Sequence, residues 1–324
     1  MERLDAFMGR ANAAYYATRD PFADFTTSPE ITQVFGEILG LWAAVVWELL
    51  GAPNPVLLVE PGPGRGTLMT DALRAIARVA PGFHAALQVH LIETSLRLRA
   101  IQASKLPDAV WHDSLDTVPH GPLLLLANEF LDALPIRQFV RRGTGWTERF
   151  VGPDGFVEQP TTDTPPLDAA EGETVELCEP ALDFARAVTT RLRQAPGAAL
   201  LLDYGPEHSA AGDSLQALAD GKFADPLSPP GIADLTAHVD FAAFGAAAQE
   251  AGAMVHGPVP QGMFLVRLGL FQRTNRLARH LPPREASAMM EATRRLAEPD
   301  RMGRLFKAIA ISSPVPAPLP GFVD

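Results

Sequence analysis

The sequence predicts an α/β fold built on a mostly parallel, doubly wound sheet, and two observations lead to this class. Apolar runs recur along the chain with helix-length segments between them, which is the pattern of βαβ units. Some of the runs, such as 123–127, are apolar throughout, as expected of strands buried on both faces. Ligands of such sheets bind at the carboxyl ends of the strands, so we expect the site there.

The elements of this sheet follow one another in a regular order. A first helix is expected from Pro29 to about Leu50, with Ser28 as its N-cap and Pro29 in its first turn. The expected strands are 56–60, 87–93, 109–114, 123–127 and 198–203, with helices over 67–80 and 95–103. Later in the chain we expect a helix over 239–251, a strand near 262–268, helices over 270–311 and a frayed tail over 313–324.

Two stretches depart from the alternating pattern. Residues 136–178 contain short strand-like pieces, which predict an antiparallel insertion, and 206–240 is rich in Pro, Gly and Asp and is expected to be irregular. The predicted divisions are an N-terminal lid and helix over 1–55, a core over 56–135 and 196–270, a β-rich insertion with a helix over 136–195, a loop insertion over 206–240, and C-terminal helices with a Pro-rich tail over 271–324.

Composition limits the classes of partner. The formal net charge of −11 and the pI of about 5.2 argue against nucleic-acid binding and favour a cationic protein segment. Cys178 is the only cysteine, so no intramolecular disulfide, cysteine zinc site or other metal site is predicted. No apolar run is long enough to cross a bilayer, and we expect a cytoplasmic protein. The sequence gives no oligomeric state.

The turn after the first strand predicts a nucleoside site. Glu60 ends the strand, and Gly62, Gly64 and Gly66 follow in an E-x-G-x-G-x-G pattern that lets backbone amides approach a ligand closely. A dinucleotide turn needs its third glycine at the position of Thr67. An acid beside a sulfonium cation fits S-adenosylmethionine (SAM) better, although a purely structural turn remains an alternative.

Further side chains are predicted to contact this cofactor. Glu93 ends the second strand, where an acid accepts hydrogen bonds from ribose hydroxyls, and Asp113 is a candidate for contact with the adenine. Thr26 and Thr27, in a segment that follows Tyr15 and Tyr16 and could act as a lid, offer hydroxyls to the ligand. A solvated role for either acid remains open.

The segment after the fourth strand predicts the acceptor site. Asn128, Glu129 and Asp132 follow the strand, and a helical turn there would place both carboxylates on one side. Two acids could hold a guanidinium in a fork and offset its charge. A capping role for Asp132 is equally open, and His238, flanked by acids, is more often structural than a general base.

Together these motifs resemble the MidA-like SAM-dependent methyltransferases, which include a mitochondrial arginine methyltransferase that assists complex I assembly. The resemblance spans roughly residues 15–310 and rests on five segments: Phe25–Glu37, Glu60–Thr67, Asn128–Pro135, Asp203–Gly205 and Leu235–Phe241. It implies a class I methyltransferase fold that binds SAM and releases S-adenosylhomocysteine. The amino terminus is short, and the segment before Asp24 lacks the family's usual glycine, which leaves the acceptor open.

The sequence therefore predicts a SAM-dependent methyltransferase that acts on protein arginine, with a complex I subunit or a similar protein as substrate. Two alternatives remain: a small-molecule O- or N-methyltransferase, and an assembly chaperone that binds SAM with little turnover.

Overall fold

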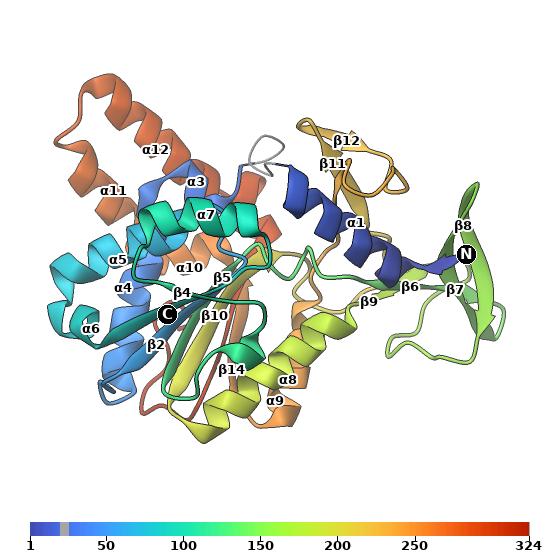
Figure 1. Cartoon of the computed structure of the whole chain (residues 1–324), viewed down its shortest axis with the longest axis horizontal. Coiled ribbons are helices and arrows are strands. Elements are labelled where there is room, and N and C mark those ends of the chain that lie inside the picture. The colour runs from blue at the N-terminus through green and yellow to red at the C-terminus, as the bar shows by residue number, and fades with distance from the viewer. Residues whose placement is uncertain (20–25, 324) are drawn as a thin grey trace. The chain divides into compact units, whose positions relative to one another are not determined.

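The computed structural model describes residues 1–19 and 26–323, and the chain divides into two compact units (Figure 1). Unit 1 comprises Met1–Phe25, Leu131–Phe184 and Pro206–Phe244, and unit 2 comprises Thr26–Phe130, Ala185–Gly205 and Gly245–Asp324. Each unit therefore gathers segments that are distant in the sequence.

Unit 2 contains a seven-stranded sheet in the order β14-β15-β10-β5-β2-β3-β4. Five strands run parallel, and β15 runs antiparallel to both of its neighbours. Strand order reverses between β2 and β5, which is where ligands bind in such sheets. The strands are β2 (Val56–Pro61), β3 (Leu87–Ile92), β4 (Val110–His112), β5 (Leu123–Asn128), β10 (Gly197–Tyr204), β14 (Met254–Pro260) and β15 (Phe306–Ser312).

The helices of unit 2 pack around this sheet (Figure 1). They are α3 (Ser28–Ile31), α4 (Gln33–Leu49), α5 (Thr67–Val79), α6 (Pro81–Ala86), α7 (Leu96–Lys105), α10 (Gln261–Arg267), α11 (Leu270–Ala278) and α12 (Pro283–Ala297), with short turns η1 (Leu115–Thr117) and η2 (Pro299–Gly303). Helices α8 (Glu179–Gln194) and α9 (Phe241–Ala251) have residues in both units. None of the helices described is long and apolar enough to cross a membrane.

Helix α4 approaches α5 closely, and two glycines permit this contact. A Cβ atom on Gly36 would lie 2.7 Å from the Cβ of Asp71, and one on Gly40 would lie 2.7 Å from the Cα of Ala72. Both distances are too short for real atoms. The start of α5, which follows the glycine turn, is therefore held by direct backbone packing.

Unit 1 contains two antiparallel sheets and helix α1 (Leu4–Thr18). The first sheet has the order β1-β7-β6-β9, with β8 paired to β7, and the second has the order β12-β11-β13. Their strands are β1 (Glu2–Arg3), β6 (Arg137–Arg142), β7 (Gly145–Gly152), β8 (Gly155–Thr161), β9 (Thr174–Leu177), β11 (Gln216–Ala219), β12 (Lys222–Ala224) and β13 (Asp234–Thr236).

The α/β class, the mostly parallel sheet and the antiparallel strands of the insertion are confirmed, while several local expectations are wrong. The second insertion is not irregular, because it holds β11, β12 and β13. The first helix does not run from Pro29: Thr32 is extended at φ −160°, and its hydroxyl accepts a 3.4 Å bond from Val34 N–H to cap α4. Ser28 is accordingly the first residue of α3, and its Oγ makes no capping bond.

The carboxyl-terminal region differs most from expectation. The strand expected near 262–268 is helix α10, and the strand lies just before it, as β14. The last part of the expected helical region is β15, every residue of which is buried. The tail is packed rather than frayed, because Leu319 is fully buried and Trp42 Nε1 donates a 3.1 Å hydrogen bond to the carbonyl of Pro320.

Candidate cofactor and acceptor site

The glycine turn lies at the point where strand order reverses. Gly62, Gly64 and Gly66 have φ angles of 61°, 54° and 73°, a left-handed region that side chains rarely adopt. A Cβ on Gly62 would also lie 3.2 Å from the Phe130 ring. Gly66 is the N-cap residue of α5 and donates a 2.7 Å bond to the Pro63 carbonyl. The glycine turn therefore leads directly into the first turn of α5. The backbone N–H groups of that turn have no partner within the helix and are available to a ligand.

Glu60 is buried at the end of β2, with only 3% of its surface exposed. Its carboxyl group accepts a hydrogen bond from the backbone N–H of Met69 in α5, while Oε2 has no hydrogen-bond partner among the described residues. Burial raises the pKa of this carboxyl group to about 8. A cation placed beside it would restore the ionised form.

Glu93, just after β3, is buried but well supplied with hydrogen bonds. Ser95 N–H donates to Oε1 at 2.8 Å, and Gln102 Nε2 donates to Oε2 at 3.2 Å. Burial raises the pKa of Glu93, and these bonds oppose that shift. The carboxylate is thus oriented by the protein before any ligand binds.

Gln102, a residue of α7, joins the strand-end acid to the glycine turn. Its Nε2 also donates to the Gly64 carbonyl at 2.8 Å, and its Oε1 accepts a 2.8 Å bond from Trp111 Nε1. The side chain is fully buried. Sequence motifs missed this residue, because a helical glutamine carries no local signal of a site.

Glu129 follows β5 in a left-handed conformation, with φ at 50°. Its Oε1 accepts hydrogen bonds from Ser28 N–H at 2.8 Å and from Asn128 Nδ2 at 2.9 Å. Burial raises the pKa of Glu129, and the hydrogen bonds from Ser28 and Asn128, followed by the charge of Arg295 on α12, oppose this shift. The neighbouring residue, Phe130, is held by a 3.1 Å bond from its N–H to Asp203 Oδ2.

The helical turn expected to align Glu129 with Asp132 does not form, because Glu129 has left-handed dihedral angles. Asp132 belongs to unit 1. Within that unit Asp132 is buried, and its carbonyl accepts a 2.9 Å bond from Ala237 N–H. Burial raises the pKa of Tyr16, and the charges of Asp234 and Asp132 add to the shift.

The segment that holds Thr26 and Thr27 is attached to the site through its neighbours. Ser28 bonds to Glu129 as described, and Glu30 Oε1 accepts a 2.5 Å hydrogen bond from Thr67 Oγ1 at the start of α5. Thr26 is exposed and Thr27 is half-buried. Asp24 and Phe25, part of the expected lid, lie outside the described residues, and Tyr15 and Tyr16 belong to α1 of unit 1.

Two other candidate site residues, Asp113 and His238, are exposed to solvent. Asp113 is exposed, and its carboxylate forms a 2.5 Å ion pair with Arg99. His238 is also exposed, and its backbone N–H donates to Ser214 Oγ at 2.8 Å. Neither has the burial of the strand-end acids.

The residues of unit 2 fit SAM chemically. At the ends of β2 and β5, Glu60 Oε2 and Asn128 Oδ1 are buried and have no hydrogen-bond partner among the described residues. Acceptors of this kind, with Glu93, suit an ammonium group and ribose hydroxyls. In the part of the chain that the structure describes, no group of three or more His, Cys, Asp or Glu residues could hold a metal ion.

Comparisons with known proteins agree with this chemistry. A family model described as S-adenosyl-L-methionine-dependent methyltransferase matches residues 38–259. The chain is 35% identical to the protein arginine methyltransferase NDUFAF7 homolog of Drosophila melanogaster, covering 96% of this chain and 80% of the relative. It is 34% identical to the mitochondrial protein arginine methyltransferase NDUFAF7 of Homo sapiens, covering 92% of this chain and 76% of the relative.

A solved structure is similar over nearly the whole chain. A Burkholderia thailandensis protein bound to S-adenosyl-homocysteine superposes with a TM-score of 0.83 at 26% identity, covering 99% of this chain and 90% of that one.

Proposed function

Because this chain belongs to the family of S-adenosyl-L-methionine-dependent methyltransferases, we propose that it methylates a guanidinium nitrogen of arginine in a protein substrate. Two relatives at about a third identity are named protein arginine methyltransferases. The observation that carries the proposal in this molecule is the half-buried Glu129 carboxylate, which two hydrogen-bond donors orient at the end of β5. A carboxylate in that setting suits a guanidinium partner.

On the donor side, we assign cofactor contacts to the acids and the turn. Glu60 would face the ammonium group, Glu93 the ribose hydroxyls, and Gly62, Gly64 and Gly66 would allow the backbone to approach. The proposed contacts of Asp113 with the adenine, and of Thr26 and Thr27 with the ligand, have weaker support, because Asp113 and Thr26 are exposed. When bound, SAM supplies an electrophilic methyl group on a sulfonium sulfur.

On the acceptor side, Glu129 would hold the guanidinium and set one nitrogen in line for attack. Asn128 would fix the carboxylate through its 2.9 Å bond. A new N–C bond forms as the S–C bond breaks, its electron pair stays on sulfur, and the nitrogen then loses a proton. Glu129 would offset the positive charge throughout, so positioning and electrostatics supply most of the rate gain.

A role for Asp132 as the second acid is also proposed. Glu129 and Asp132 do not share a helical face, so the support for this role comes from the surroundings of Asp132 in unit 1. Within unit 1, its charge and that of Asp234 act on Tyr16, and these three polar groups are of a kind that could hold a cation.

The family resemblance suggests a subunit of respiratory complex I as the first substrate to test. A cytoplasmic location is a further proposal, which cell fractionation tests directly, since the relatives are named mitochondrial.

The decisive experiment replaces Glu129 by Gln. We expect methyl transfer to fall at least about a hundredfold, because a neutral amide cannot offset the guanidinium charge, while S-adenosylhomocysteine binding changes less than about twofold. Glu48→Gln, at an exposed position of α4, is the control for loss of one acid. Mass spectrometry of proteins from cells with and without the gene identifies the methylated residue.

Two outcomes would redirect the assignment. A methylated metabolite with no change in protein arginine would favour the small-molecule methyltransferase. Cells that keep normal complex I assembly with the Glu129→Gln protein, but not without the gene, would favour the assembly chaperone.

A further inference from the structure

The turn between α11 and α12 concentrates positive charge on an acidic protein. Arg276, Arg279 and Arg284, which we call the arginine tip, lie within nine residues that also include His280 and contain no acidic residue. The whole chain carries a formal net charge of −11. The tip is thus a local reversal of the charge of the molecule.

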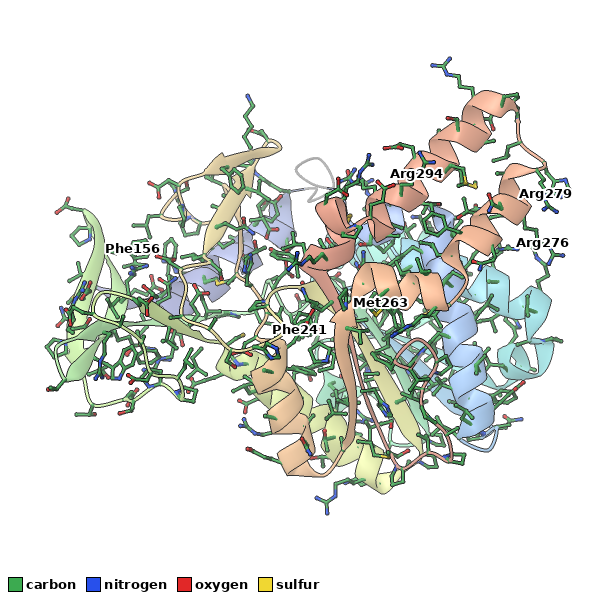
Figure 2. The ribbon with its side chains drawn as sticks, turned by 180° about the vertical axis from the view of Figure 1, so that it is seen from behind. Phe156, Phe241, Met263, Arg276, Arg279 and Arg294 are labelled. Carbon is green, nitrogen blue, oxygen red and sulfur yellow. The ribbon has the colours of Figure 1, made fainter. Side chains whose placement is uncertain are left out.

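The three arginines of the tip are exposed, and none forms an ion pair with any residue that the structure describes. Figure 2 shows Arg276 and Arg279 extending outward from α11. Other arginines of the same region are paired: Arg273 with Glu37 at 2.7 Å, and Arg301 with Glu291 at 2.5 Å. The tip therefore retains a charge that its surroundings do not neutralise.

Helix stability accounts for Arg276 and Arg279, which lie in the last turn and at the C-cap of α11, where cations complement the helix dipole, but it does not account for Arg284. Arg284 is in the first turn of α12, where a cation opposes the helix dipole at a cost of a few tenths of a kcal/mol. An acid there would be favourable, and the first turn does contain Glu285. The position of Arg284 favours instead an anionic partner outside the chain.

The tip rests on a firm support. The two helices pack through buried residues, and Thr274 Oγ1 lies 2.9 Å from Thr293 Oγ1 between them. The ion pair from Arg273 to the buried Glu37 joins α11 to α4. Side chains on such a support can bind a partner with little loss of order in the backbone.

We propose that the arginine tip is a docking surface for an acidic segment of the protein substrate. This inference rests on the proposed function and deepens it, since it concerns how the same enzyme recognises its substrate. Arginine side chains bind carboxylates in a fork geometry that favours Asp and Glu over diffuse negative charge.

Other anionic partners fit less well. No large apolar side chain is exposed anywhere in 270–297, a range described in full, so the tip lacks the apolar face that membrane binding requires. Three cations beside Glu285, on a chain of net charge −11, make a small footprint for a polyphosphate backbone.

The helix also sets a spacing between the docking segment and the methylated arginine. Arg284 is in the first turn of α12, and Arg295, whose charge acts on Glu129, is in the last. Eleven residues of helix span about 17 Å, which an extended peptide covers with about five residues. We expect the acidic segment to lie at least that far from the target arginine in the substrate sequence.

The test is binding of a fluorescent oligoglutamate peptide, followed by anisotropy. Two double variants are compared. The tip variant carries Arg276→Glu and Arg279→Glu, and the control carries Arg78→Glu and Lys222→Glu. Arg78 and Lys222 are exposed cations elsewhere on the chain, so both double variants change the net charge equally. The tip variant should bind at least about tenfold more weakly, the control should stay within about twofold, and wild-type binding should weaken with salt.

Thermal melting and S-adenosylhomocysteine titration show whether each variant is folded. Equal loss in both double variants, or no loss in the tip variant, would overturn the proposal. So would tighter binding of an RNA oligonucleotide or of phosphatidylserine vesicles than of oligoglutamate. Tip-dependent binding without any arginine methylation would keep the docking surface and reject the proposed function, and the opposite pair of results would do the reverse.

Discussion

Two buried glutamates, Glu60 at the end of β2 and Glu93 just after β3, differ in how their carboxyl groups are hydrogen-bonded. Glu93 accepts hydrogen bonds from Ser95 and Gln102, while Glu60 accepts one from Met69 and has its Oε2 without a partner among the described residues. Neighbouring positions on one sheet edge thus carry a carboxylate that the protein has already organised and one that it has left dependent on a ligand.

The contrast teaches how one edge can serve both ends of a cofactor. Neutral ribose hydroxyls need acceptors fixed in space, which is the role that we propose for Glu93. A cationic ammonium group supplies its own electrostatic drive, and it can ionise a carboxyl group that burial has kept protonated. Binding at Glu60 should therefore be coupled to proton release, and binding at Glu93 should not.

The largest expected effect is on the pH dependence of stability. Glu60 has a folded-state pKa of about 8, above its unfolded value, so its contribution is full at low pH and is lost as pH rises towards 8. Between pH 4.5, the ordinary pKa of the group, and about pH 8, the free energy of unfolding of the wild type should fall by roughly 1.4 kcal/mol per pH unit more than that of Glu60→Gln. Urea denaturation at several pH values measures this difference.

The wild type and Glu60→Gln also test the expected pH dependence of ligand binding. Affinity for S-adenosylhomocysteine, which retains the ammonium group, should rise with pH in the wild type and stay level in Glu60→Gln. If affinity changed equally with pH in the two proteins, the proposed distinction between Glu60 and Glu93 would be lost.

A smaller effect is expected from Glu93→Ala. Each hydrogen bond to a charged group contributes about 1.5–3 kcal/mol, so loss of the ribose contacts should weaken S-adenosylhomocysteine by about a hundredfold. Isothermal titration calorimetry gives the affinity, with Glu48→Ala as the matched loss of an exposed acid. Full retention of affinity in Glu93→Ala would mean that this acid does not hold the ribose.

The smallest effect tests the organisation of Glu93. Gln102→Leu removes the bonds to Glu93 and to the Gly64 carbonyl while keeping the side-chain volume similar, and affinity should fall about tenfold with little change in its pH dependence. Gln272→Leu, at an exposed position of α11, is the control. A Gln102 variant with unchanged affinity would show that Glu93 is oriented without it.

The parallel sheet could be predicted because some of its strands, such as β5 and β10, contain continuous apolar runs bounded by turns. Strand β15 is also rich in apolar residues but contains Lys307; it follows a long helical region and could not be distinguished from a helix by pattern. Strand β14 contains Pro258 and Pro260, which obscured it. Length and composition alone do not resolve such cases.

At the site, the strand-end acids and the glycines carry signals that are local in the sequence. Gln102 and Glu30 do not, because their contacts with the turn arise only when α7 and α3 pack against it. The expected alignment of Glu129 with Asp132 failed for a backbone reason that side-chain spacing could not reveal.

That backbone conformation of Glu129 has a further consequence. For a residue with a Cβ, left-handed angles cost about 1–2 kcal/mol relative to helical ones, and glycine would avoid most of the cost. A search for thermostable variants should therefore select glycine here and, in doing so, remove the carboxylate that we propose holds the acceptor. Stability screens of this protein need an activity filter at that one position.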